Sequence, residues 1–192
     1  MNTTFRGIVA LKDSVKKLIT IGLWTAIVLF ILRYLITKPT ELYDIFGCVG
    51  EAIGISVILV GFYERFLWKH NPFEKTPRIA GVYAGVLEYE YHGASGKKDA
   101  SIKIQQTLLT VNLRITTDEI TSNTVVSSLI KENEESILYY TYVTNPKSKY
   151  SKDNPIKYGT CRLIIDNKNE LHGIYWTSGK TNGDITLKRS GV

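Results

Sequence analysis

Beyond Pro77 the chain is unusually rich in tyrosine, and these side chains are its best candidates for ligand chemistry. A tyrosine ring offers a flat face on which a nucleobase stacks, for roughly 1–3 kcal/mol per base, and a hydroxyl that orients a polar ligand. Tyrosine is also a favoured strand residue, so the same residues fit simple packing in a sheet. The aromatic residues concerned are Tyr83, Tyr89, Tyr91, Tyr139, Tyr140, Tyr142, Tyr150, Tyr158, Tyr175 and Trp176.

Two arginines in the same region are candidates for contact with a phosphate. Arg114 and Arg162 each stand inside a stretch with strand character. An arginine held near a pocket can bind a phosphate with two parallel hydrogen bonds. The alternative, that both lie on a solvated outer face of a sheet, fits the sequence equally well.

Catalytic and metal-binding patterns are not found in the sequence. His70, His92 and His172 are far apart and show no spacing that suits zinc, and no HExxH or CxxC occurs. Ser95 stands in GASG, but no strand-turn-helix context surrounds it. No phosphate-binding GxxxxGK[ST] and no dinucleotide-binding GxGxxG is present. We therefore predict neither an enzyme, nor a metal site, nor a resident cofactor, and assign no catalytic residue.

The front of the chain contains two apolar stretches, at residues 18–36 and 45–67. Each is close to the roughly 20 residues needed to cross a bilayer, and a short polar turn separates them. A signal peptide would need a shorter apolar run and a small-residue cleavage site, which the Thr37-Lys38-Pro39 that follows does not provide. The pattern predicts a hairpin of two transmembrane helices.

The second apolar stretch contains an acidic residue among small ones. Glu51 stands inside Gly50-Glu51-Ala52-Ile53-Gly54, a GxxxG pattern that lets helices approach closely. An ionisable group inside a membrane is costly and marks function by default. Our hypothesis is that Gly50, Glu51 and Gly54 serve oligomer assembly or pore polarity. In the alternative, the span covers only residues 53–68 and Glu51 lies near the outer interface.

Basic residues flank the hairpin on the sides of the two termini and are scarce in the loop between the helices. By the positive-inside rule, this distribution places both termini in the cytoplasm. It also accounts for much of the net charge of +6 and the pI near 9.2, so we predict no DNA or RNA partner. The two cysteines, Cys48 and Cys161, fall in different parts of the chain and imply no disulfide framework. The flanking residues are Arg6, Lys12, Lys16 and Lys17 before the first span and Arg65, Lys69, Lys75 and Arg78 after the second.

After a proline-containing boundary the hydrophobic period changes to two. Alternating or β-branched stretches separated by turn signals predict about seven or eight antiparallel strands and almost no helix. Such a set closes most simply into a barrel or a two-sheet sandwich, and glycines within the strands favour the barrel. The predicted strands cover 79–91, 101–115, 124–131, 136–144, 158–165, 171–177 and 184–189. The predicted organisation is a cytoplasmic segment at 1–17, a hairpin at 18–68, a linker at 69–78 and a cytoplasmic ligand-sensing barrel at 79–192.

The order of these features resembles a known family, the two-transmembrane, β-strand-rich effectors of CBASS, bacterial anti-phage systems built around cGAS/DncV-like nucleotidyltransferases. The resemblance covers nearly the whole chain. It rests on GVYAG at 81–85, IQQT at 104–107, SS at 127–128, LYYTY at 138–142, NP at 145–146, GTCRL at 159–163 and LHGIY at 171–175, in this order after two spans. Where a histidine is expected before the glycine at 159, this chain has Tyr158.

The resemblance implies a two-pass protein of the bacterial inner membrane whose cytoplasmic barrel binds a cyclic dinucleotide made by a partner nucleotidyltransferase. Binding would drive homo-oligomerisation of the membrane helices in the lipid, disrupt the membrane and stop growth of the infected cell. The ligand contacts expected from motif positions are Tyr83, Gln106, Thr107, Tyr140, Tyr142, Asn145 and Arg162.

Two other functions stay open from the residues alone. One is a membrane-tethered barrel that acts as a scaffold or binds lipid or protein, in which the tyrosines are only core. The other is an enzyme at the bilayer surface. The receptor needs a polar pocket that accepts phosphate, the scaffold an apolar pocket or none, and the enzyme a coordinated acid and base.

Overall fold

A computed structural model describes residues 3–91 and 93–190 of the chain. His92, one of the three histidines considered above, lies outside these described residues. The chain divides into two compact units that are described separately here. One unit contains the apolar hairpin and comprises Leu11–Lys75 with Thr107–Leu109; the other contains the strands and comprises Met1–Ala10, Thr76–Gln106 and Thr110–Val192.

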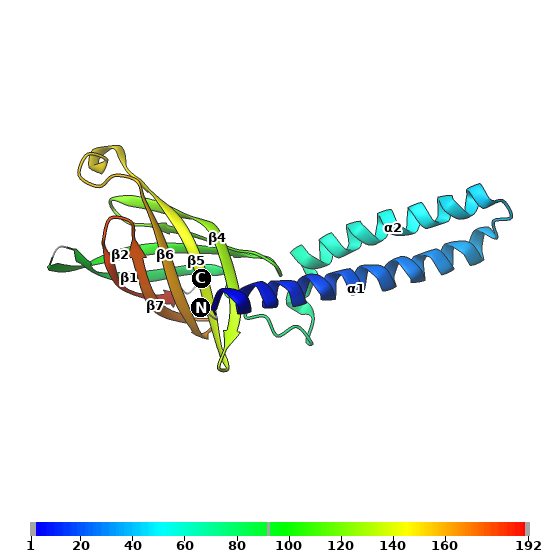
Figure 1. Cartoon of the computed structure of the whole chain (residues 1–192), viewed down its shortest axis with the longest axis horizontal. Helices are drawn as coiled ribbons and strands as arrows, with labels where there is room; N and C mark the ends of the chain where they lie inside the picture. The colour runs from blue at the N-terminus through cyan, green and yellow to red at the C-terminus, as the bar shows by residue number, and fades with distance from the viewer. Residues whose placement is uncertain (1–2, 92, 191–192) are drawn as a thin grey trace. The chain divides into compact units, whose positions relative to one another are not determined.

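Two helices, α1 (Thr3–Thr37) and α2 (Leu42–Arg65), form an antiparallel hairpin (Figure 1). The stretches Ser14–Thr37 and Leu42–Arg65 are long and apolar enough to cross a membrane, each with a mean hydropathy of 2.1. The predicted pair of apolar helices is thereby confirmed. Helix α1 ends before Lys38, which has φ of +47° and precedes Pro39, because a residue before proline resists the helical conformation. Helix α1 also includes most of the predicted 1–17 segment, since it begins at Thr3.

Eight antiparallel strands form a closed barrel in which each strand pairs with the next and β8 pairs with β1 (Figure 1). This architecture confirms the predicted barrel of about eight strands. Short 3-10 helices follow α2 (η1, Leu67–His70) and β5 (η2, Ser148–Tyr150). The strands are β1 Gly81–Tyr91, β2 Ala94–Gln106, β3 Val111–Thr116, β4 Ile120–Glu132, β5 Glu135–Pro146, β6 Lys157–Asn167, β7 Glu170–Thr177 and β8 Asn182–Arg189.

The strand boundaries differ most from the sequence-based prediction around β2 and β3, and β4 also begins earlier than predicted, at Ile120 instead of residue 124. Residues 101–115, predicted as one strand, belong to two, because β2 ends at Gln106 and β3 begins at Val111. Residues 93–99, which fall between the predicted strands 79–91 and 101–115, instead lie in β2 from Ala94 onward. Its pairing with β1 explains the difference, since Glu88 and Lys97 are register partners and form an ion pair across the two strands.

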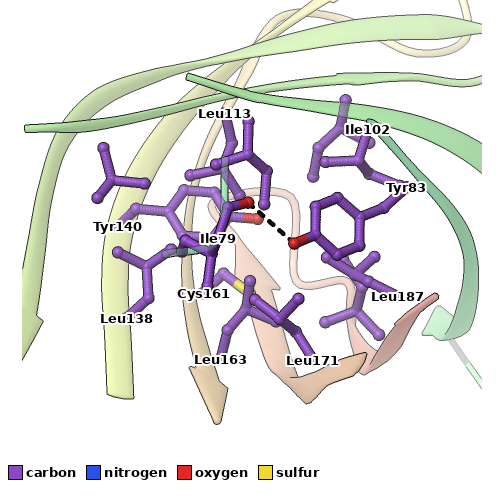
Figure 2. Close-up of a cluster of buried hydrophobic side chains, with 14 of the residues drawn as sticks. Ile79, Tyr83, Ile102, Leu113, Leu138, Tyr140, Cys161, Leu163, Leu171 and Leu187 are labelled. Carbon is purple, nitrogen blue, oxygen red and sulfur yellow. Dashed lines mark hydrogen bonds between the residues drawn. The ribbon is translucent and has the colours of Figure 1, made fainter. Parts of the chain in front are cut away.

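The barrel interior is filled by apolar side chains that alternate with outward-facing residues along each strand. Figure 2 shows part of this core, in which the Tyr83 hydroxyl donates to the backbone oxygen of Ile79 at 2.9 Å. The oxygen of Lys168, between β6 and β7, lies 2.9 Å from the same hydroxyl. Tyr83 and Ile79 are fully buried. The end of the barrel at which β1 begins is therefore closed by packed side chains.

Candidate functional site

A cavity of about 340 Å³ opens at the end of the barrel formed by the β1–β2, β3–β4, β5–β6 and β7–β8 connections. Its volume lies in the range of small-molecule sites, roughly 300–1,000 Å³. Aromatic rings, hydroxyls and charged groups all contribute to its wall. The lining includes Tyr89, Tyr91, Lys98, Thr117, Glu119, Tyr140, Tyr142, Tyr150, Asp153, Asn154, Lys157 and Tyr175.

Two of the wall tyrosines lie flat against glycines on the neighbouring strand. Tyr142 of β5 is the register partner of Gly159 in β6, and Tyr89 of β1 is the partner of Gly96 in β2. An alanine Cβ at Gly159 would lie 2.5 Å from the Tyr142 hydroxyl oxygen, and one at Gly96 would lie 2.5 Å from that of Tyr89. Glycine at these two positions thus makes the space in which each ring lies along the wall.

The floor of the cavity is lined by phenols that stay neutral. Burial raises the pKa of Tyr140 well above its usual range and also raises that of Tyr142. Burial likewise raises the pKa of Tyr175 and of the nearby Cys161 thiol to about 12 each, although a hydrogen bond from Tyr140 partly offsets the shift at Cys161. A neutral phenol can donate a hydrogen bond to a phosphate or a base while its ring stacks.

Charged groups of both signs stand at the cavity mouth. Lys98 packs over the ring of Tyr89 and Lys157 over that of Tyr91, each with 5.7 Å between the ammonium nitrogen and the ring centroid. Nζ of Lys98 also lies 2.5 Å from Oε1 of Glu119. The mouth therefore places two ammonium groups beside aromatic faces, an arrangement that suits a ligand with bases and phosphates.

Four of the seven ligand contacts expected from the sequence lie along β5 and β6. Tyr140 and Tyr142 line the cavity, with ring centroids 5.7 Å apart. Asn145 is exposed near the end of β5. Arg162 faces outward between two buried neighbours, and its Nε donates to the Tyr139 hydroxyl at 3.1 Å. Arg114, the other arginine considered, is an exposed residue of β3.

The remaining three expected contacts lie away from the cavity. Tyr83 and Gln106 belong to the closed end, where Gln106 accepts from the Ile79 amide at 2.9 Å and donates to the Pro77 oxygen at 2.7 Å. Gln106 thus ties the segment before β1 to the barrel. Thr107 follows β2 directly. A ligand contact at any of the seven residues stays a prediction.

Several wall residues were not singled out from the sequence. Lys98 lies within β2, and the pairing of β2 with β3 brings it beside Glu119 of the β3–β4 turn. Asn154 and Lys157 come from the β5–β6 loop and the start of β6, which reach the same end of the barrel. For the charged residues, sequence patterns alone do not decide which turns share one end of the barrel.

A second region of interest lies within the helical hairpin. Ser56 is buried, and its hydroxyl donates to the Gly22 oxygen at 2.6 Å, so the α1-facing side of α2 includes Ser56. A Cβ added at Gly50 or Gly54 would meet no atom within 4 Å. Glu51 instead contacts α1, with its Oε2 2.7 Å from Nε of Arg33. The pairing of Glu51 with Arg33 was not anticipated from the sequence.

Within residues 3–91 and 93–190, no group of three or more His, Cys, Asp or Glu side chains is arranged to hold a metal ion. His172 pairs with Asp166, its Nδ1 lying 2.6 Å from the carboxylate on the exposed surface. Cys48 and Cys161 are both free and buried.

Comparison with known proteins gives matches over most of the chain. Residues 74–189 match the family described as "Cap15, cyclic dinucleotide receptor domain". The chain is 40% identical over 182 residues to CD-NTase-associated protein 15 from Staphylococcus schleiferi, covering 93% of this chain and 99% of that protein. It is also similar to two solved barrels. A redesigned β-barrel matches with 12% identity and a TM-score of 0.45, covering 59% of this chain and 92% of its own. The redesigned barrel mFAP1 bound to DFHBI matches with 14% identity and a TM-score of 0.41, covering 58% and 94%.

Proposed function

Because the chain belongs to the Cap15 family and carries that family's cyclic dinucleotide receptor domain, we propose that it is a membrane effector of a CBASS anti-phage system that responds to a cyclic dinucleotide. The family assignment confirms the resemblance to β-strand-rich CBASS effectors seen in the sequence. The proposed ligand comes from a partner nucleotidyltransferase of the cGAS/DncV type.

The observation that carries the receptor proposal is the cavity at the open end of the barrel, with tyrosine rings beside two lysines. The bases stack on wall tyrosines such as Tyr142 and Tyr175, and the phosphates bind Lys98 and Lys157. Further lysines of the β5–β6 loop, Lys149 and Lys152, add positive charge near the mouth and attract an anionic ligand. A scaffold whose tyrosines serve only as core does not require ammonium groups beside these rings.

The membrane part of the proposal rests on the two apolar helices and on the charge pattern around them. Helices α1 and α2 cross the bacterial inner membrane, with both termini and the barrel on the cytoplasmic side. In that location the barrel meets a ligand made in the cytoplasm. The protein needs no catalytic residue for this function.

Activation is proposed to proceed through association of hairpins from several chains. Gly50 and Gly54 have open space beside them, so the backbone of α2 can approach a helix of a second chain closely. Glu51, which pairs with Arg33 inside one hairpin, can exchange that partner for one on a neighbouring chain. Assembly of such hairpins would disrupt the membrane and arrest the infected cell.

The receptor proposal is tested by thermal unfolding of the full chain in detergent micelles with a panel of cyclic dinucleotides, and with linear dinucleotides and ATP as controls. A ligand at about 100 times its Kd stabilises the folded state by about 2.7 kcal/mol, which raises the midpoint by several degrees. Lys157→Ala should abolish most of this shift, whereas Lys188→Ala, which removes an exposed lysine outside the cavity lining, should keep it. If no cyclic dinucleotide shifts a folded chain, the receptor proposal is wrong and a scaffold becomes the better function.

A further inference from the structure

Two carboxylates line the cavity assigned to an anionic ligand, that of Asp153, an exposed residue, and that of the partly buried Glu119. A ligand with two phosphates is repelled by the charge of Glu119 unless this carboxylate faces hydrogen-bond donors of a base. Oε1 of Glu119 lies 2.5 Å from Nζ of Lys98, and Oε2 accepts from Nδ2 of Asn154 at 3.4 Å. The Glu119 side chain is only 25% exposed, so solvent screens it incompletely. The carboxylate is therefore an energetically important part of the binding site.

The turn that carries Glu119 is held in one conformation by hydrogen bonds. The Thr117 hydroxyl accepts from the amides of Glu119 and Ile120 at 3.2 and 3.1 Å. Lys147, in the β5–β6 loop, donates from Nζ to the backbone oxygens of Thr117 and Asp118 at 3.1 and 2.7 Å. Its backbone amide donates to the backbone oxygen of Glu119 at 2.8 Å. Glu119 is thus presented by a rigid support, which a residue that discriminates between ligands requires.

We propose that Glu119 is a specificity-determining residue that selects a cyclic dinucleotide containing guanine. Among the common bases, only guanine presents two adjacent donors on its Watson–Crick edge, N1–H and the 2-amino group, which match the two oxygens of a carboxylate. Adenine and cytosine each place a ring acceptor beside their amino group, and uracil flanks its N–H with two carbonyls. Each of these bases sets an acceptor against a carboxylate oxygen.

Guanine binding also has a consequence for Lys98. When the base donates to both oxygens of Glu119, it shares the carboxylate with Lys98 and Asn154, so Lys98 is held less strongly and can also contact a phosphate of the same ligand. The carboxylate thus couples base recognition to phosphate binding. This inference rests on the proposed function, since it names the base class that the receptor site selects.

The test measures the affinity of the full chain, in detergent micelles, for c-di-GMP, cyclic GMP–AMP, c-di-AMP and c-di-UMP by isothermal titration calorimetry, with 3′–5′ and mixed 2′–5′/3′–5′ linkages where they exist. The wild-type chain should bind its best guanine-containing ligand at least about tenfold more tightly than any ligand without guanine. Glu119→Gln should reduce this advantage below about threefold. Its affinity for c-di-AMP should stay equal or rise, because an amide neither repels phosphate nor retains Lys98.

The matched control is Glu88→Gln, which removes an ion pair with Lys97 on the outer face of the β1–β2 hairpin, the hairpin that also carries Lys98. This variant should still bind guanine-containing ligands more tightly than ligands without guanine. Equal affinity of the wild-type chain for c-di-AMP or c-di-UMP overturns the inference and leaves the receptor proposal standing. A Glu119→Gln chain that keeps the tenfold advantage also overturns it. If no ligand in the panel binds, the proposed function fails and the inference fails with it. The wild-type comparison needs no variant, so the inference stays testable even where Glu119→Gln is unstable.

Discussion

Replacing Gly159 by alanine should push the Tyr142 ring out of its position on the cavity wall. A Cβ at residue 159 would lie 2.7 Å from Cε2 of Tyr142 and 2.5 Å from its hydroxyl oxygen. Carbon atoms in contact normally stay about 3.5–4.0 Å apart, so the ring has to move by about 1 Å. Overpacking of this kind typically costs about 1–3 kcal/mol. For a barrel of this size, the melting midpoint should fall by about 4 °C per kcal/mol.

The assay is thermal unfolding of the full chain in micelles, followed by near-ultraviolet circular dichroism, for wild type, Gly159→Ala, Tyr142→Leu and the double variant. Without the Tyr142 ring, an alanine at residue 159 meets no such clash and should be neutral or stabilise by about 0.4–1 kcal/mol, because it restricts the unfolded chain. The sign of the effect should thus reverse between the two backgrounds. A Gly159→Ala change that costs the same free energy in both backgrounds, or less than about 0.5 kcal/mol in wild type, would refute this reasoning.

Three further changes should follow from the same geometry. Glu51→Leu leaves Arg33 without its partner and should weaken ligand-triggered growth arrest in cells, and unchanged arrest would contradict a role for Glu51 in assembly. Ser56→Leu should loosen the hairpin, because it removes the hydrogen bond to the Gly22 oxygen and forces a larger side chain into a buried contact. Cysteine cross-linking between α1 and α2 measures this effect, and an unchanged cross-linking rate would argue against it. The barrel should lose stability as pH rises from about 9 toward 12, because burial raises the pKa of Cys161 from 9.0 to about 12 and the folded state then holds a proton that the unfolded state has released. Denaturant titrations at pH 8, 9 and 10 measure how the free energy of unfolding changes with pH, and Cys161→Ala should reduce this change. Equal stability at all three pH values would contradict the assignment.

The fold was largely predictable because its two hydrophobic periods are unambiguous. Long apolar runs predicted α1 and α2, and alternation along residues such as Leu138, Tyr140 and Tyr142 predicted strands with one buried face. The β1–β2 hairpin was predicted less well. Its small and charged residues have low strand propensity, and its pairing depends on cross-strand partners such as Glu88 and Lys97.

The site was predictable only where a residue's position within one strand decides its direction. Tyr140 and Tyr142 alternate with outward residues of β5, and the structure places both on the cavity wall. The same alternation turns Arg162 outward, because its neighbours Cys161 and Leu163 are buried. The charged residues at the cavity mouth could not be predicted from alternation along one strand. Lys98 and Glu119 come together because β2 extends beyond its predicted start at residue 101 and pairs with β3, whereas Asn154 and Lys157 reach the same end only when the barrel closes.

The most direct test of the receptor site is to locate a bound cyclic dinucleotide on the full chain, by hydrogen exchange or by a structure of the complex. We expect the ligand at the open end of the barrel, in contact with Tyr142 and Lys157 and protecting the β3–β4 and β5–β6 connections from exchange. A ligand bound instead at the closed end, beside Tyr83 and Gln106, or on the outer face around Arg162, would contradict the assignment of this cavity as the receptor site.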